Sequence, residues 1–141
     1  MKKFFRTSAT DTTALLLRLA LGIVILAHGL QKTLGWFGGG GIEGSMGFLT
    51  GMGIPAALAM LVIVGESLGA LSLILGFFTR LCALSIVIIM VGAVLLVHAS
   101  NGLVGQGGYE FHVLAITMGV VLMMRGGGAF SLDSIVAKML K

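Results

Sequence analysis

Four long apolar runs constrain the fold of this chain more than any other feature of the sequence. They cover about residues 13–30, 55–75, 81–97 and 109–124. Each is long enough to be read as a helix across the hydrocarbon core of a bilayer, although the fourth reaches about 27 Å only if it continues to residue 126. A barrel would need many alternating strands instead. We therefore predict an all-α membrane protein, a four-transmembrane-helix bundle formed by residues 1–141 as a single domain.

The composition also describes a membrane protein. Of the 141 residues, 57% are hydrophobic and 10% are charged, whereas soluble domains average about 45–50% and about 25%. The mean hydropathy is +1.12. The nine Lys and Arg are scattered between the apolar runs, so no nucleic-acid partner is expected. Cys82 lies within an apolar run and is expected to pack as a small hydrophobic residue.

Basic residues are distributed unequally between the two sides of the predicted spans. On one side the sequence has Lys2, Lys3, Arg6, Arg80, Arg125, Lys138 and Lys141. The opposite side carries only Lys32. Because loops rich in Lys and Arg stay in the cytoplasm, both termini are expected to be cytoplasmic.

Two further helices are predicted outside the spans. In the connection over residues 31–54, apolar residues recur at helical spacing, which indicates a short helix on or in the membrane surface. Residues 131–141 form an amphipathic pattern with Ser131 as a candidate N-cap, which predicts a C-terminal interfacial helix that anchors to the lipid bilayer. Its apolar face contains Leu132, Ile135, Val136, Met139 and Leu140, opposite Asp133, Lys138 and Lys141.

Glycines within the spans indicate close helix packing. Gly65 and Gly69 form a pair of small residues separated by three others. Such pairs let two helices approach closely in lipid. The pair predicts either a tight packing of helices within one chain or the interface of a homodimer.

Two ionisable residues lie deep in the predicted spans. Arg18 is about a turn and a half inside the first span, and Glu66 is near the middle of the second. Insertion of such a group costs at least about 2.5–3.5 kcal/mol, so each needs a partner or a purpose. Counted from the predicted helix ends, the two differ in depth by about 4–5 Å. A buried Arg18–Glu66 pair is therefore expected, either as a structural lock or as part of a ligand or proton site.

A second polar group is predicted at the outer ends of the spans. His28 and Lys32 are one turn apart on the first span, His98 ends the third, and Glu110 and His112 begin the fourth. Placement at the membrane interface explains Lys32 and the nearby Trp36, but it explains three histidines less well. Glu110 and His112 point to different sides of a helix, so no metal site is predicted. A pocket that hydrogen-bonds or exchanges protons with a quinone-like ligand remains the sharper hypothesis.

Several of these segments together resemble the DoxX family of small bacterial membrane proteins. The resemblance covers about residues 13–133 and rests on Arg18 with LALGIVILAHG, on Lys32, on GESLGALSLILGFFTR at residues 65–80, and on His98, Glu110 and GGGAFSLD. It implies a four-helix protein of the bacterial inner membrane. The family's recurrent polar positions match Arg18, Lys32, Glu66, Arg80 and Asp133. Related proteins resemble the membrane subunit of thiosulfate:quinone oxidoreductase or accompany oxidative-stress and quinone detoxification systems.

These observations lead to one main functional expectation and two alternatives. The main expectation is a quinone-associated subunit or accessory of a redox or detoxification system. Glu66, Arg18 and His28 are its candidate catalytic residues, and its candidate ligand-binding residues are Lys32, His98, Glu110, His112 and Trp36. The sequence has no CxxC motif and no flavin or nucleotide fingerprint, so electrons would pass through a bound quinone or a redox partner protein. The alternatives are a small-solute transporter or channel built around Arg18 and Glu66, and a structural assembly protein.

Overall fold

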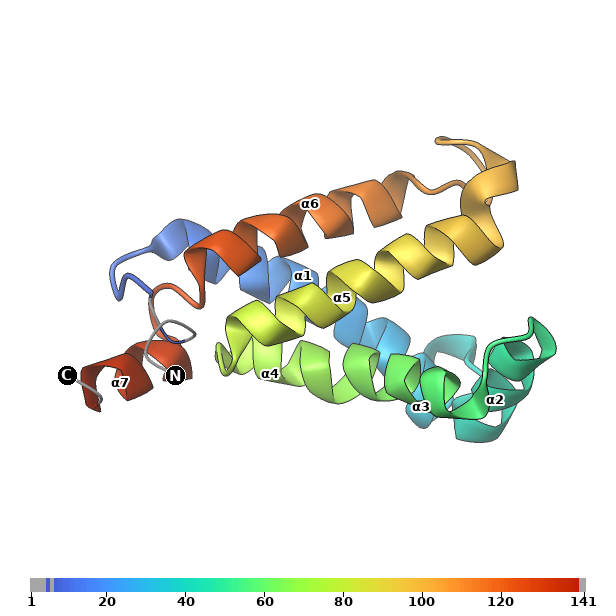
Figure 1. Ribbon diagram of the computed structural model, residues 1–141, viewed down its shortest axis with the longest axis horizontal. Coiled ribbons are helices and arrows are strands. Elements are labelled where there is room, and N and C mark those ends of the chain that lie inside the picture. Colours follow the sequence, from blue (N-terminus) through green and yellow to red (C-terminus); the bar gives the residue numbers. More distant parts are fainter. Residues whose placement is uncertain (1–4, 6, 140–141) are drawn as a thin grey trace.

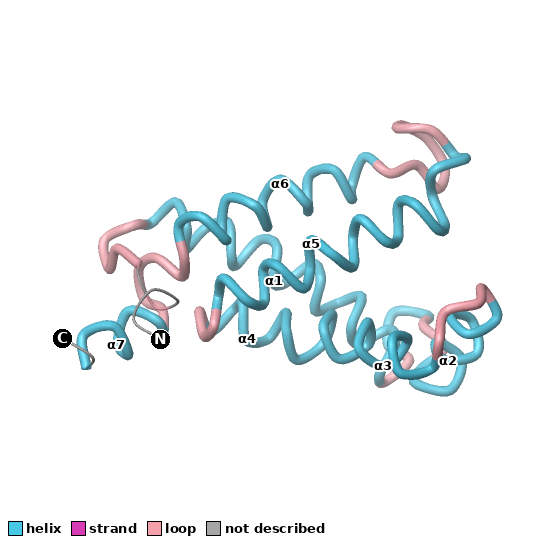
Figure 2. Tube along the Cα trace, viewed as in Figure 1, coloured by secondary structure: helices cyan, strands magenta, loops and turns pink. Residues whose placement is uncertain are grey.

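The computed structural model describes residue 5 and residues 7–139, and in this part of the chain all regular structure is helical (Figure 2). The helices are α1 (Thr12–Thr33), η1 (Trp36–Gly38), α2 (Gly41–Gly51), α3 (Ala56–Val64), η2 (Gly65–Gly69), α4 (Ala70–Leu75), α5 (Thr79–Ala93), η3 (Val94–His98), η4 (Ala99–Asn101), α6 (Glu110–Arg125) and α7 (Leu132–Met139). The predicted all-α fold is confirmed. Lys2, Lys3, Arg6, Leu140 and Lys141 lie outside the described residues, and the orientation in the membrane stays a prediction.

Three of the predicted spans correspond to long apolar helices. The stretches Thr12–Thr33, Ala56–Leu75 and Thr79–Asn101 are each long and apolar enough to cross a membrane. The first begins after Asp11, whose side chain accepts the Ala14 N–H at 3.0 Å as an N-cap. The fourth predicted span corresponds to α6, which has 16 residues. A fourth membrane crossing therefore stays a prediction.

The four long helical segments pack side by side (Figure 1). α1 packs against α4, η2 and α6, and α5 packs against α6, η2 and α4. Their shared core consists of the buried residues Ala14, Leu21, Ile25, Ala70, Leu73, Ala83, Ile86, Met90, Ala115 and Leu122. We call the end that carries Arg18 and α7 the arginine end, and the end that carries Lys32 and the three histidines the histidine end. In Figure 1 these are the left and right ends.

The glycine pair in the second span packs inside the chain. A Cβ built on Gly65 would lie 2.6 Å from the Ile89 side chain, and one on Gly69 would lie 3.7 Å from the Ser85 hydroxyl. Both glycines therefore face α5, where they let the two helices approach closely. Of the two roles that the sequence left open for this pair, the structure shows packing within one chain.

Arg18 holds the arginine end together through backbone carbonyls. Its side chain is 2% exposed. Nε donates to the Gly127 carbonyl at 2.9 Å, and Nη2 donates to Ala129 at 3.0 Å and to Phe130 at 2.7 Å. Nη1 donates to the Ile74 carbonyl. One guanidinium thereby joins the start of α1 to the end of α4 and to the turn before α7.

Asp133 lies opposite the exposed apolar residues Ile135 and Met139 of α7, as the sequence predicted, and this polar side of the helix is buried against the protein. Asp133 is 1% exposed, and its carboxylate accepts the N–H groups of Phe78 at 2.8 Å and Thr79 at 2.9 Å. These donors lie at the start of α5, where a helix has unsatisfied N–H groups and favours negative charge. Gly76, between α4 and α5, has φ +67°, and a Cβ there would lie 2.9 Å from the Ser131 Cα. Only glycine fits at that turn.

The other side of α7 faces away from the protein. Ile135 is 51% exposed and Met139 is 80% exposed. The helix begins after Ser131, whose hydroxyl oxygen accepts the Ser134 N–H at 3.2 Å, as predicted for an N-cap. A helix with buried polar residues against the protein and exposed apolar residues on its far side has the arrangement expected at a membrane interface.

The connection between the first two spans contains the predicted short helix, α2. It begins at the last of four consecutive glycines, residues 38–41. A Cβ on Gly39 would collide with the backbone of Gln31, so the glycine run packs directly on the end of α1. Leu49 of α2 is buried with Ala59 and Ile63 of α3. The glycines thus fold the connection back over the histidine end.

Candidate functional site

The buried carboxylate of Glu66 pairs with Lys32. The Lys32 ammonium forms a salt bridge with Glu66 Oε2, and the two side chains are 25% and 5% exposed. The predicted Arg18–Glu66 pair is therefore wrong. The carboxylate that interacts electrostatically with Arg18 is Asp133. Glu66 is held by Lys32 at the histidine end, whereas Arg18 is held by backbone carbonyls at the arginine end.

Arg18 and Glu66 do not pair because α1 and the second span are staggered along their axes. A depth count from the helix ends places Arg18 near Glu66 only if both helices end at the same level. Instead, the α1 residue packed on the Glu66 backbone is Gly29. Arg18 precedes Gly29 by 11 residues, which is about 16 Å of helix at 1.5 Å per residue. That distance exceeds the reach of an arginine side chain.

Two residues of the histidine end belong to π-helical turns. Glu66 lies in η2 and His98 ends η3. A π turn inserts an extra residue into a helix, widens it locally and changes the direction of the side chains that follow. Such turns are rare and occur frequently at functional sites. Their coincidence with Glu66 and His98 marks the histidine end as the candidate site.

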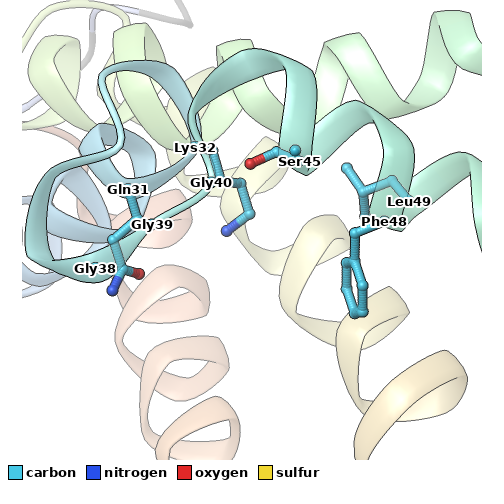
Figure 3. A pocket seen from close by; sticks show the side chains of 9 residues that line it. Gln31, Lys32, Gly38, Gly39, Gly40, Ser45, Phe48 and Leu49 are labelled. Carbon is cyan, nitrogen blue, oxygen red and sulfur yellow. The ribbon is translucent and has the colours of Figure 1, made fainter.

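A groove of about 370 Å³ lies beside the ion pair (Figure 3). It is lined by Gln31, Lys32, Gly38, Gly39, Gly40, Gly44, Ser45, Phe48 and Leu49. Lys32, Gln31 and Ser45 supply polar groups, whereas Phe48 and Leu49 supply an apolar edge. The volume lies within the range of about 300–1,000 Å³ typical of small-molecule sites, which also combine apolar walls with a few polar groups.

Three imidazoles from three helical segments meet at the same end. The His98 and His112 rings are 4.4 Å apart between centroids, and His28 packs on Phe111 at 5.5 Å. His112 is buried, with 9% of its surface exposed, and it directly follows Phe111, the residue on which His28 packs. α1, η3 and α6 therefore each contribute one imidazole to a single cluster, which we call the histidine cluster.

Hydrogen bonds define the protonation of two of these rings. His98 Nδ1 lies 2.7 Å from the Gly107 carbonyl, which can only accept, so Nδ1 carries the proton. Gln31 Nε2 donates to the Phe37 carbonyl at 3.3 Å, which turns its Oε1 toward His28 Nδ1 at 3.1 Å. Nδ1 of His28 is then the donor as well. In their neutral forms both rings present Nε2 as an acceptor, which has no hydrogen-bond partner among the described residues.

His112 differs from the other two. Its Nδ1 is buried and has no hydrogen-bond partner within the described part of the protein. A buried polar atom of this kind is uncommon, because each unsatisfied group costs free energy, about 1–3 kcal/mol. The atom therefore marks a place where a ligand or water would be stabilised.

The remaining predicted site residues are not part of the histidine cluster. Glu110 is exposed at the start of α6, and Trp36 is 55% exposed and packs on Phe37. Arg18 is at the opposite end. Gln31 was missed as a site residue, although its position three residues after His28 on α1 indicates contact between their side chains.

The arrangement offers hydrogen-bond donors and acceptors within one region. The Lys32 ammonium can donate to a ligand oxygen, and the free Nε2 atoms of His28 and His98 can accept from a hydroxyl or take up a proton. Among the described residues, no group of three or more His, Cys, Asp or Glu side chains has the geometry to hold a metal ion. The chemistry suggested by these side chains is hydrogen bonding and proton exchange.

Comparisons with known proteins agree with a membrane protein of this type. The family model described as DoxX matches residues 13–99. The chain is 28% identical over 124 residues to "Putative oxidoreductase CatD" of Bacillus subtilis (strain 168), covering 88% of this chain and 87% of that protein. It is 31% identical over 130 residues to "Inner membrane protein YqjF" of Escherichia coli (strain K12), covering 91% and 95%.

A third relative, from Haemophilus influenzae, has the name "Uncharacterized protein" and is 32% identical over 133 residues, covering 92% of this chain and 86% of the relative. No solved structure matches. The family match extends over more than half of the chain, and these relatives align along most of their own length. The chain belongs to the DoxX family of membrane proteins.

Proposed function

We propose that this protein is a quinone-binding subunit or accessory of a membrane redox or detoxification system. The observation that carries the proposal is the salt bridge between Lys32 and Glu66, which lies beside a groove with both polar and apolar walls. The histidine cluster is close by, because its member His28 lies one helical turn before Lys32 on α1. A structural role alone would require only the ion pair. The printed name of the CatD relative favours redox chemistry over other uses of such a site.

The residues present fit a quinone head group. Quinone carbonyl oxygens accept hydrogen bonds, which the Lys32 ammonium and the Ser45 hydroxyl can donate, and hydroquinone hydroxyls donate, which the His28 imidazole can accept. The unsatisfied Nδ1 of His112 adds a buried polar atom that is not used within the described fold. When bound, a quinone accepts two electrons and two protons in becoming a hydroquinone.

The protein's own groups would orient the head group and move protons. Glu66 holds the Lys32 ammonium in place, and Lys32 in turn orients a carbonyl oxygen. His28, on the same side of α1, is placed to exchange a proton through Nε2, while its Nδ1 stays bonded to Gln31. Because the sequence carries no redox cofactor motif, the electrons would come from a redox partner protein.

The transport hypothesis loses its structural basis. It depended on an Arg18–Glu66 site, whereas the Arg18 guanidinium donates to backbone carbonyls at the arginine end. No observation specifically favours a protein that only assists assembly.

Quinone binding to the purified protein tests this proposal. The protein is extracted in mild detergent, its bound lipids are analysed for quinone, and ubiquinone is titrated into the lipid-depleted protein. The neutral pair Lys32→Met with Glu66→Gln avoids a buried unpaired charge. Glu43→Gln, at an exposed position of α2 that does not line the groove, is the control.

We expect quinone in the wild-type extract, unchanged affinity in the control, and a loss of about tenfold or more in the double variant at an unchanged size-exclusion profile. A wild-type protein that neither carries nor binds quinone contradicts the proposal. So does a folded double variant that binds quinone as tightly as the wild type.

A further inference from the structure

The contact between α5 and the second span stops well before either helix ends. Where the two helices are in close contact, Ser85 faces Gly69 and Ile89 faces Gly65. Because the two helices are antiparallel, moving four residues forward on α5, from Ser85 to Ile89, corresponds to moving four residues back on the second span, from Gly69 to Gly65. If this register continued, Gly92 would lie opposite Val62. A Cβ built on Gly92, however, would meet no atom within 4 Å. The two helices have therefore separated at the level of Gly92.

The separation continues toward the histidine end. Figure 1 shows α5 and α3 diverging from their close approach near η2. α3 packs against α2, η2 and α1, and α5 follows α6. Leu96 of η3, the segment that continues α5, is 63% exposed, and Leu61 on the second span is 62% exposed. Apolar side chains thus remain uncovered on both sides of the separation.

A polar site lies where this separation begins. η2, the last part of the second span that still packs on α5, contains Glu66. Its partner Lys32 lines the groove together with Phe48. In Figure 3 both the Lys32 ammonium and the Phe48 ring point away from α2, toward the side of the view that contains α5 and α6. The separation therefore begins at the level of the Lys32–Glu66 pair and has exposed apolar side chains along it.

We propose that the gap between α3 and the α5–η3 segment is a lateral opening for a membrane-dissolved quinone with an isoprenoid tail. The head group reaches Lys32 and Glu66 through it, while the tail stays between Leu61 and Leu96 in contact with the bilayer. This assignment rests on the proposed function and names its substrate class. Access from water would require the tail to leave the hydrocarbon phase, which is unfavourable for apolar surface. A lateral route avoids that step.

Cysteine cross-linking tests the opening without any ligand. In a Cys82→Ser background, the pair Gly69→Cys with Ser85→Cys lies in the closed part of the interface, and Val62→Cys with Gly92→Cys lies in the proposed opening. A disulfide requires Cβ atoms about 3.5–4.5 Å apart. In membranes we expect the first pair to cross-link on oxidation and the second pair to remain reduced. Cross-linking of the second pair to a similar extent would show that the helices are closed there.

Quinone binding then tests the route in the full-length protein in lipid nanodiscs. Gly92→Trp places a large side chain in the opening, whereas Val91→Trp places the same side chain at the same depth about 100° around α5. We expect Gly92→Trp to weaken binding of a ubiquinone with a long isoprenoid tail by about tenfold, with tailless ubiquinone and the Val91→Trp control unaffected.

Two results would contradict different parts of the reasoning. If Gly92→Trp binds the tailed quinone normally while the neutral Lys32 and Glu66 double variant does not, the opening is refuted and the proposed function stands. If the wild-type protein binds neither quinone, the proposed function and this ligand assignment are refuted together.

Discussion

Replacement of Arg18 by methionine should destabilise the protein strongly, although Arg18 is far from the candidate site. The guanidinium donates to the carbonyls of Ile74, Gly127, Ala129 and Phe130. Each buried acceptor that loses its donor costs about 1 kcal/mol at the lower end of the usual range. The four together amount to about 4 kcal/mol, which is a large part of the 5–15 kcal/mol that stabilises a typical domain.

This loss can be read as a shift in melting temperature. At about 3 °C per kcal/mol for a chain of this size, Arg18→Met should lower the Tm by about 12 °C. Arg18→Lys keeps the charge and three N–H donors, so it should lower the Tm by about 3–6 °C. Heating the detergent-solubilised protein and measuring the surviving size-exclusion peak gives these values.

A matched control is available at the same end of the protein. Arg125 pairs with Asp11, but its side chain is 49% exposed, and exposed ion pairs contribute little to stability. Arg125→Met should therefore change the Tm far less than Arg18→Met. If the two variants melt at the same temperature, the carbonyl contacts of Arg18 do not support the fold. If Arg18→Met is as stable as the wild type but no longer binds quinone, Arg18 belongs to the functional site.

Three further predictions follow from other contacts. Asp133→Asn keeps the shape of the side chain but can accept through one oxygen only, so it should cost about 1–3 kcal/mol and lower the Tm. A hydrogen bond from Arg125, followed by the Ala14 N–H, lowers the pKa of Asp11 below its usual 3.8. The Asp11 contribution to stability is therefore complete above that value and is lost as the pH falls through the lower folded pKa. The Tm difference between wild type and Asp11→Asn should accordingly shrink below about pH 3.8; a constant difference would contradict this sign. Gly29→Ala should lower the Tm because its Cβ would lie 2.6 Å from a backbone carbon of η2, whereas Gly92→Ala meets open space and should be neutral.

The sequence predicted at which end of the helices the candidate site lies, but it did not predict which of its side chains are in contact. The histidines could be assigned to one end of the helices because each lies at the end of an apolar run. Sequence spacing also related His28 to Lys32, since residues four apart share one side of a helix. Contact between His98 and His112, however, depends on how α5 and α6 pack, and the exposed position of Glu110 depends on its rotation relative to that packing.

The sequence by itself determined the all-helical fold, the approximate limits of the three long apolar helices, the short helix before the second span and the capped helix at the C-terminus. These features follow from local properties: runs of apolar residues, helical periodicity and capping residues act within a few turns of the chain. The tertiary structure decided which charges meet. A count along the predicted spans places Arg18 and Glu66 at similar depth in the membrane, but the stagger set by the packing of Gly29 on η2 separates them. That stagger pairs Lys32 with Glu66 and leaves Arg18 to the carbonyls beside Asp133. Helix register depends on side-chain shape across two segments distant in sequence, and no local pattern encodes it.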